Sequence, residues 1–168
     1  MRDWQKENLI DFVKGEEESL EMFGDYIKDK SEISSMVYDI EEIAEQVVKK
    51  VDEGLVADFD YTDESLEAIE KMVDDAFGSI EDANSDLSEI VEDMVFDLGA
   101  YLGITLINSL GGAWRFRADF IHSSIHFPSI DSECFPFHRV ARRLLHGKSE
   151  SLIDFYDALV GIFDVAEY

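Results

Sequence analysis

The sequence predicts a mainly helical α+β protein: N-terminal helices, a small antiparallel β-meander at about residues 113–135, and two C-terminal helices. Three observations support this class. Apolar residues recur with the helical period up to about residue 110, the period changes to strict alternation after Gly111-Gly112, and helical periodicity returns after Pro136. Helices and strands that are grouped rather than alternating are typical of α+β folds.

Apolar residues in the first half have helical spacing. The most regular stripe consists of Ile33, Val37, Ile40, Ala44, Val47 and Val51. Its alternating separations of four and three residues amount to less than three heptads. Flanking Met36, Ile43 and Val48 widen the stripe, which favours a helix packed on a core over a coiled coil. A homodimer through the Ile33–Val51 helix remains the alternative.

The later elements are bounded by capping and turn residues. Thr62, followed by two acidic residues, predicts the N-cap of a helix. A longer helix is expected from about residue 86 to 110, apolar nearly all round in its second half. Trp114, Phe116, Ala118 and Phe120 then alternate with Arg115, Arg117 and Asp119, as in a strand with one buried face. Pro136 suits the first turn of a helix that ends at Gly147, and Ser149 is expected to cap the last helix.

Charge is distributed unevenly along the chain. Residues 1–98 contain 31 Asp and Glu against 8 Lys and Arg, whereas residues 99–168 contain 8 against 6; the net charge is −25. We interpret residues 1–57 as an acidic helical extension packed on an α+β core domain, residues 58–168, within one globular unit. The 46% hydrophobic content is sufficient for a real core.

The negative charge limits the classes of partner. Direct binding to nucleic acid is disfavoured because its affinity comes mainly from Lys and Arg that neutralise phosphates. Anionic membrane surfaces are disfavoured for the same reason, whereas association with basic proteins is favoured. The residues expected to contact such a partner are Glu41, Glu42, Glu45, Asp74, Asp75, Glu81 and Asp82.

A cytoplasmic location is expected from three features. Cys134 is the only cysteine, so no intramolecular disulfide can form. The polar first residues lack the apolar core of a signal peptide. The longest apolar stretch, Val95 to Leu110, is interrupted by polar residues and is too short to span a bilayer.

Several segments share a pattern with known proteins. They are Asp60–Leu66 ahead of a helix, Gly99–Gly103, Gly112–Trp114, and Phe135-Pro136 leading to Val140–Arg143 and Gly147. Over about residues 58–160 this pattern resembles a broad group of small bacterial α+β domains of unknown function. The resemblance implies the fold and, as for some similar domains, a role as an immunity protein or interaction module. It implies no catalytic residues. Relatives commonly place a Glu after the second glycine of the helix motif, where this chain has Ile104.

One set of residues has the composition of a metal site. His122, His126, Cys134 and His138 follow the spacing H-x3-H-x7-C-x3-H, and zinc accepts Cys and His ligands. The segment contains no Cys-x2-Cys knuckle, however, and two prolines divide it. Ordinary histidines are favoured, and no cofactor is predicted.

A group of basic residues stands out in this acidic chain. The arginines are Arg115, Arg117, Arg139, Arg142 and Arg143. They are expected on the outer face of the first strand and on the helix face opposite the apolar stripe. Pairing with the protein's own acidic helices is favoured, and an anion pocket is the alternative.

These features favour a non-enzymatic interaction protein, an immunity-like or antitoxin-like inhibitor that binds a basic protein. Catalysis is disfavoured because Cys134 and His138 are predicted on different elements and no Gly-x-Ser-x-Gly turn is present. The first alternative is an enzyme, acting on a small molecule or dependent on a metal. Its cleft would lie between the Gly99–Gly103 helix and the Trp114 strand. The second alternative is a DNA mimic.

Overall fold

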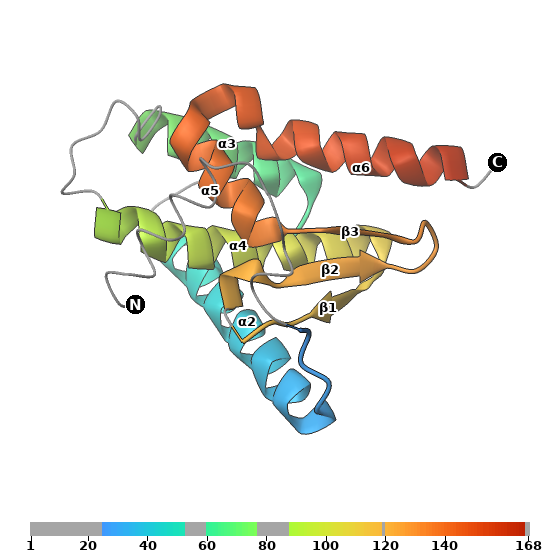
Figure 1. Cartoon of the computed structure of the whole chain (residues 1–168). Coiled ribbons are helices and arrows are strands. Elements are labelled where there is room, and N and C mark those ends of the chain that lie inside the picture. Colours follow the sequence, from blue (N-terminus) through green and yellow to red (C-terminus); the bar gives the residue numbers. More distant parts are fainter. Residues whose placement is uncertain (1–24, 53–59, 77–87, 119, 167–168) are drawn as a thin grey trace.

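Helix α4 is the central element of the fold, with α2 below it and α3 and α6 above it in the view of Figure 1. The computed structural model describes residues 25–52, 60–76, 88–118 and 120–166. The α+β class is confirmed, because helices surround a three-stranded antiparallel sheet. The elements are α2 (Lys30–Asp52), α3 (Asp63–Ala76), α4 (Ser88–Leu110), β1 (Ala113–Arg115), the 3-10 turn η4 (Phe120–His122), β2 (Ser124–Phe127), β3 (Ser132–Cys134), α5 (Pro136–His146), the 3-10 turn η5 (Gly147–Glu150) and α6 (Leu152–Ala166).

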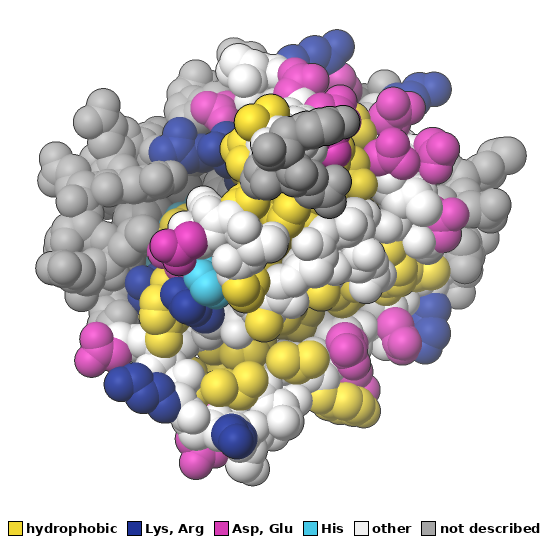
Figure 2. All heavy atoms as spheres, turned by 90° about the vertical axis from the view of Figure 1, so that its right-hand side faces the viewer, with side chains coloured by type: hydrophobic (Ala, Val, Ile, Leu, Met, Phe, Trp, Pro, Cys, Tyr) yellow, Lys and Arg dark blue, Asp and Glu magenta, His cyan; other side chains and the backbone are white. Residues whose placement is uncertain are grey.

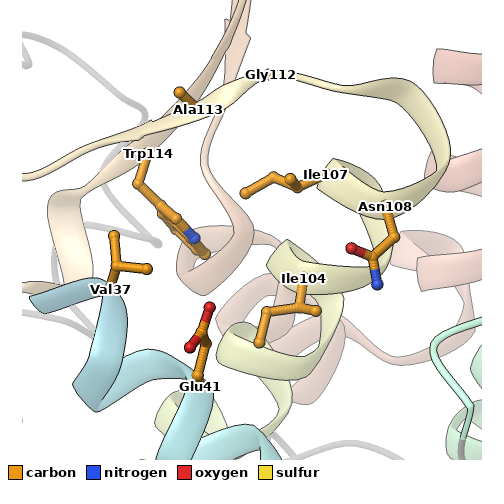
Figure 3. A pocket seen from close by; sticks show the side chains of 8 residues that line it. All are labelled: Val37, Glu41, Ile104, Ile107, Asn108, Gly112, Ala113 and Trp114. Atoms are coloured by element: carbon orange, nitrogen blue, oxygen red, sulfur yellow. The ribbon is translucent and has the colours of Figure 1, made fainter. Parts of the chain in front are cut away.

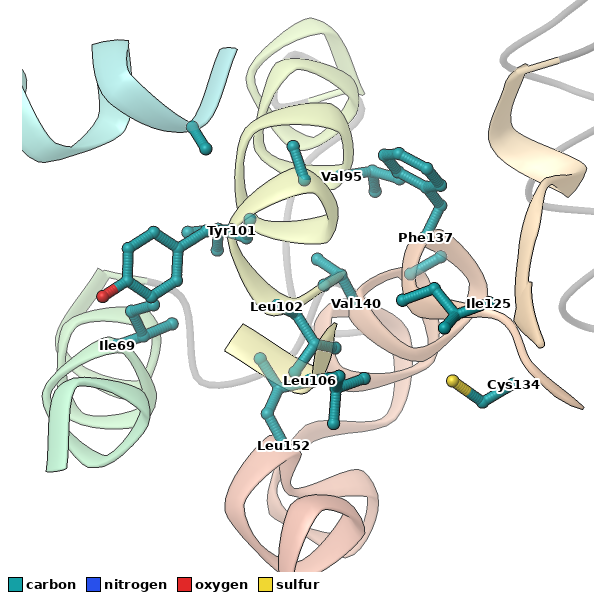
Figure 4. Close-up of a cluster of buried hydrophobic side chains, with 14 of the residues drawn as sticks. Ile69, Val95, Tyr101, Leu102, Leu106, Ile125, Cys134, Phe137, Val140 and Leu152 are labelled. Atoms are coloured by element: carbon teal, nitrogen blue, oxygen red, sulfur yellow. The ribbon is translucent and has the colours of Figure 1, made fainter. Parts of the chain in front are cut away.

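The hydrophobic core forms around α4 because this helix is apolar on nearly every side. Its residues Ala100, Tyr101, Leu102 and Leu106 have no exposed surface. Figure 4 shows side chains from α3, α5 and the sheet converging on it, as expected for a helix buried on several sides. None of the described helices combines the length and apolar composition needed to cross a membrane.

Helix α2 packs on α4 through the stripe that the sequence predicted. Ile40, Ala44 and Val47 are 0%, 0% and 5% exposed within the single chain. These residues share one hydrophobic cluster with Leu102 and Leu106 of α4. Their burial within one chain leaves none of the three available to a second copy, so we propose no homodimer through this seam.

The sheet has the order β1-β2-β3, with β1 and β3 at its edges. Trp114 pairs with Ile125, and Ile125 pairs in turn with Cys134. The first strand is shorter than the alternating pattern predicted. Phe116 and Arg117 are both buried, at 0% and 6% exposure, so inward and outward positions stop alternating after Arg115. The placement of Arg117 on an outer face was therefore wrong.

Most predicted helix ends are confirmed. Thr62 caps α3 reciprocally with Ser65: each side-chain oxygen accepts the other residue's backbone N–H. Gly111 and Gly112, with φ of 78° and 99°, turn the chain out of α4 in the left-handed conformation that glycine tolerates. The predicted cap at Ser149 was wrong, because Ser149 lies inside η5 and Ser151 Oγ accepts the Asp154 N–H instead.

Two glycines let α4 approach its neighbours closely. A Cβ atom added at Gly99 would collide with Phe137 of α5, and one added at Gly103 would collide with the indole of Trp114. The close approach inferred from their four-residue spacing is confirmed.

We expect Gly103→Ala to destabilise the protein by about 1–2 kcal/mol in urea unfolding, because overpacking outweighs the gain in helix propensity. Gly161 in α6 provides the control, since a Cβ there meets no atom within 4 Å. Gly161→Ala should stabilise by about 0.5–1 kcal/mol. Equal effects at the two positions would contradict this account of Gly103.

Candidate interaction surface

The solvent side of α2 carries a run of acidic residues, and the basic residues of the helix lie only near its two ends. Asp39, Glu41, Glu42 and Glu45 are exposed, and Tyr38 among them is 59% exposed. Residues 31–48 contain no Lys or Arg. These five side chains are called the acidic face of α2 below.

The raised pKa of Tyr38 reflects the negative potential of this face. Its hydroxyl donates a hydrogen bond of 2.9 Å to Glu42 Oε1. This hydrogen bond and the charges of Glu42, Glu45 and Asp39 raise the pKa of Tyr38, because they oppose a further negative charge on the phenol. The acidic face therefore favours a cationic neighbour.

Two hollows flank the acidic face. The first, of about 440 Å³, is lined by Asp39, Glu42, Ile43 and Gln46. The second, of about 250 Å³, lies between α2, α4 and the start of β1 (Figure 3). Its lining residues are Val37, Glu41, Ile104, Ile107, Asn108, Gly112, Ala113 and Trp114. We call it the α2–β1 hollow.

The α2–β1 hollow borders the position predicted for an enzyme cleft. The predicted gap beside Gly99 and Gly103 is filled, because the Trp114 indole packs against Gly103 and Phe137 packs against Gly99. The hollow begins at Ile104, the next residue along α4. Among the described residues of its lining, Glu41 is the only ionisable one.

The other predicted contact acids are situated differently. Asp74 is half-buried and already paired, because its carboxylate meets Arg143 at 2.5 Å and Lys148 at 3.2 Å. Asp75 lies in α3, but its side chain is outside the described part of the chain. Glu81 and Asp82 also lie outside the described residues. Among the acids predicted to contact a partner, therefore, only those of α2 are exposed in the described part of the chain.

The five arginines are divided among three sets of contacts. Arg143 is fully buried and pairs with Glu70 and Asp74 of α3, which corrects its predicted position on the outer helix face. Arg139 and Arg142 both meet Glu150, at 3.0 and 3.8 Å.

The other two arginines contact Tyr26. The Arg117 guanidinium stacks 4.1 Å from the centre of its ring and donates to the His122 carbonyl, while exposed Arg115 lies 5.7 Å from the same ring. Because the five side chains are divided among three separate sets of neighbours, we propose no anion pocket.

Two of the four candidate metal ligands meet. His122 Nδ1 and His138 Nε2 share a hydrogen bond of 2.8 Å in the interior. Burial lowers the pKa of His122 to about 4 and that of His138 further, and the nearby charge of Arg117 acts in the same direction on both. Neutral imidazoles are therefore the stable forms here.

The other two candidates have different surroundings. His126 Nε2 lies 3.7 Å from Asp131. Burial raises the pKa of the Cys134 thiol to about 12, so almost no thiolate is available as a nucleophile near neutral pH. Within the described part of the chain, no three His, Cys, Asp or Glu side chains are grouped as metal ligands.

A polar cluster that the sequence pattern does not predict anchors the segment before α2. Tyr26 donates a hydrogen bond of 2.7 Å to Glu133 Oε2, which also accepts one of 2.9 Å from Ser124 Oγ. Nearby, the Ile27 N–H donates to the Phe116 carbonyl at 2.7 Å. No periodic signal identifies Tyr26, because its partners are about a hundred residues away.

The Tyr26 hydroxyl is expected to contribute about 1–2 kcal/mol to stability, because it bonds a carboxylate in a half-buried site. Tyr26→Phe tests this selectively, since Phe retains the ring beneath Arg117. The matched control is Tyr38→Phe, which removes an exposed hydroxyl from another glutamate. We expect less than about 0.5 kcal/mol there. Similar losses in urea unfolding would contradict the anchoring role.

The end of α6 carries an exposed apolar region. Ile162 and Val165 are 51% and 76% exposed. Figure 2 shows hydrophobic side chains in a band across the face at which α6 ends, with charged side chains around the band. This apolar region does not indicate the chemistry of a partner, whereas the negative charges on the acidic face of α2 favour a basic one.

Comparison with known proteins yields no assignment: no family model, curated protein or solved structure matches the chain.

Proposed function

We propose that this is a non-enzymatic interaction protein that binds a basic protein through the acidic face of α2. One observation carries the proposal: Glu41, Glu42 and Glu45 are exposed together on a helix stretch without Lys or Arg, between two hollows. An acid that only neutralises the protein's own positive charge is expected to pair with a basic side chain, as Asp74 pairs with Arg143 and Lys148.

The carboxylates on this face and the hollows beside it contribute to binding in different ways. Exposed ion pairs contribute only about 0–1 kcal/mol each, so the carboxylates mainly accelerate and orient association with a basic surface. Affinity comes from side chains that are desolvated in pockets. The two hollows beside α2 and the exposed ring of Tyr38 offer such contacts.

Inhibition of a basic enzyme, as by an immunity or antitoxin protein in the cytoplasm, is the specific role we propose. A basic active-site groove, such as that of a nuclease, presents the charge that this face complements. The buried, unpaired thiol of Cys134 is compatible with a reducing compartment.

Affinity capture from the lysate of the native host tests the proposal with three baits. They are the wild-type protein, the α2 variant Glu41→Gln/Glu42→Gln/Glu45→Gln, and the α3 variant Asp63→Asn/Glu64→Gln/Glu67→Gln. Both variants neutralise three exposed acids on one helix, so they have the same net charge. We expect a basic protein to bind the wild-type and α3 baits, and to be lost from the α2 bait and at high salt.

Direct titration of the purified captured protein against the same three proteins completes the test. Equal affinity for the α2 and α3 variants would overturn the proposed surface and leave acidity as a general solubility feature. Capture of many DNA-binding proteins through both variants would favour a DNA mimic, which presents carboxylates over a wide surface.

A further inference from the structure

The α2–β1 hollow combines apolar walls with one carboxylate. Val37, Ile104 and Ile107 form aliphatic walls, and the indole of Trp114 forms an aromatic one. Figure 3 shows the Glu41 carboxylate directed into the space between Trp114 and Ile104. The hollow therefore places one negatively charged carboxylate among lining groups that are otherwise mostly apolar.

The size of the hollow limits what it can hold. Sites for drug-sized ligands and cofactors usually measure about 300–1,000 Å³. The α2–β1 hollow, at about 250 Å³, is smaller and open to solvent, as its exposed lining residues Glu41, Asn108 and Ala113 show. A single long side chain is a better match in volume than a cofactor.

We infer that the α2–β1 hollow receives one arginine side chain of the basic partner. This inference rests on the proposed function for the existence of that partner. The methylene groups of arginine match the aliphatic walls, and its guanidinium can stack on the indole of Trp114. Its planar N–H groups can donate to the Glu41 carboxylate and to the Asn108 side-chain oxygen. Lysine has neither the planar face nor the paired donors, so arginine fits this set of groups better.

The partner's backbone can approach the hollow along the edge of the sheet. Strand β1 is an edge strand, and Ala113 at its start is exposed. Among the described residues, the segment before α2 contacts the chain just beyond the other end of β1, where the Ile27 N–H donates to the Phe116 carbonyl. Ala113 and Trp114 border the hollow, so a segment that passes this edge can direct a side chain into it.

Two blocked tripeptides serve as probes: acetyl-Gly-Arg-Gly-amide and its citrulline analogue, which is similar in shape but uncharged. Their binding is followed at low salt through the indole N–H resonance of Trp114 and the methyl resonances of Ile104 and Ile107. We expect saturable shifts with the arginine peptide at roughly millimolar concentration, as suits one anchored side chain. Citrulline should bind at least about threefold more weakly, because it lacks the charge that Glu41 attracts.

Glu41→Gln and Glu45→Gln form a matched pair on the exposed side of α2, and only Glu41 lines the hollow. Glu41→Gln should weaken the arginine peptide at least about threefold, whereas Glu45→Gln should leave the affinity nearly unchanged. Equal binding of arginine and citrulline, or equal effects of the two substitutions, would overturn the inference.

The two proposals fail in different ways. If the captured partner needs the α2 acids but the peptides do not distinguish Glu41→Gln from Glu45→Gln, the interaction surface stands and the arginine anchor falls. If the peptides depend on Glu41 while the captured partner ignores the α2 acids, the arginine site stands and the proposed surface falls.

Discussion

The substitution Arg143→Met is expected to lower the free energy of unfolding by about 3 kcal/mol, because it leaves two partly buried carboxylates without the buried guanidinium that they share. The Arg143 guanidinium is fully buried and donates to Glu70 Oε2 at 2.7 Å and to Asp74 Oδ1 at 2.5 Å. The other oxygen of Glu70 accepts the Leu152 N–H, so the same network joins α3, α5 and the start of α6. Thermal unfolding should show Tm lower by roughly 6–12 °C.

Arg139→Met is the control for this prediction. The Arg139 side chain is 37% exposed and pairs with Glu150 at 3.0 Å. Its guanidinium also lies over the Phe155 ring, so a loss of only about 0–1 kcal/mol is expected. If Arg143→Met were within 1 kcal/mol of the wild type, the buried pairs would be dispensable for stability.

Acidification from pH 6.5 to pH 4.5 is expected to reduce stability by roughly 4 kcal/mol through His122 and His138. Burial lowers the pKa of His122 from 6.5 to about 4 and that of His138 further. The folded protein therefore keeps both rings neutral at pH values where the unfolded chain binds protons. Their contribution is fully present above pH 6.5 and is lost as pH falls toward the folded-state pKa values.

The carboxylate of Asp74 acts below this pH range. Burial tends to raise the pKa of Asp74, but the hydrogen bonds from Lys148 and Arg143 outweigh it and hold the pKa below 3.8. The stability linked to this carboxylate is therefore present above pH 3.8 and is lost only in stronger acid. Urea unfolding between pH 6.5 and pH 4.5 thus isolates the histidines from Asp74.

The histidine prediction has two checks. His138→Gln should make stability less dependent on pH over this range, because it removes a ring whose pKa burial lowers in the folded protein. In the intact protein, NMR titration should show the imidazole resonances of His122 and His138 unchanged until below pH 5. Titration of either ring near pH 6.5 would contradict the assigned pKa directions.

Local patterns were sufficient to predict most of the fold. The α2 stripe, the end of α4 at Gly111 and the start of α5 at Pro136 each depend on neighbouring residues, and all three are confirmed. The buried arginines could not be predicted in this way. Arg143 is separated from Glu70 by 73 residues, and only the tertiary fold shows that a carboxylate is available to it.

The candidate site was predictable in part. The sequence indicated the acids of α2, because charge and helical period are local properties. It could not indicate that Glu41 faces Trp114 and Ile104, because these residues come together only when α2 packs on α4. Nor could it separate Glu41 from Asp74, whose carboxylate is engaged by Arg143 and Lys148.

Because its walls come from α2, α4 and the start of β1, the α2–β1 hollow exists only while α2 is docked. Local unfolding that detaches α2 destroys the hollow, so any occupant stabilises the docked state by mass action. Amide hydrogen exchange along α2 should therefore slow in proportion to occupancy, while that of distant α6 stays unchanged. The hollow thus couples binding to the fraction of molecules in which α2 is detached.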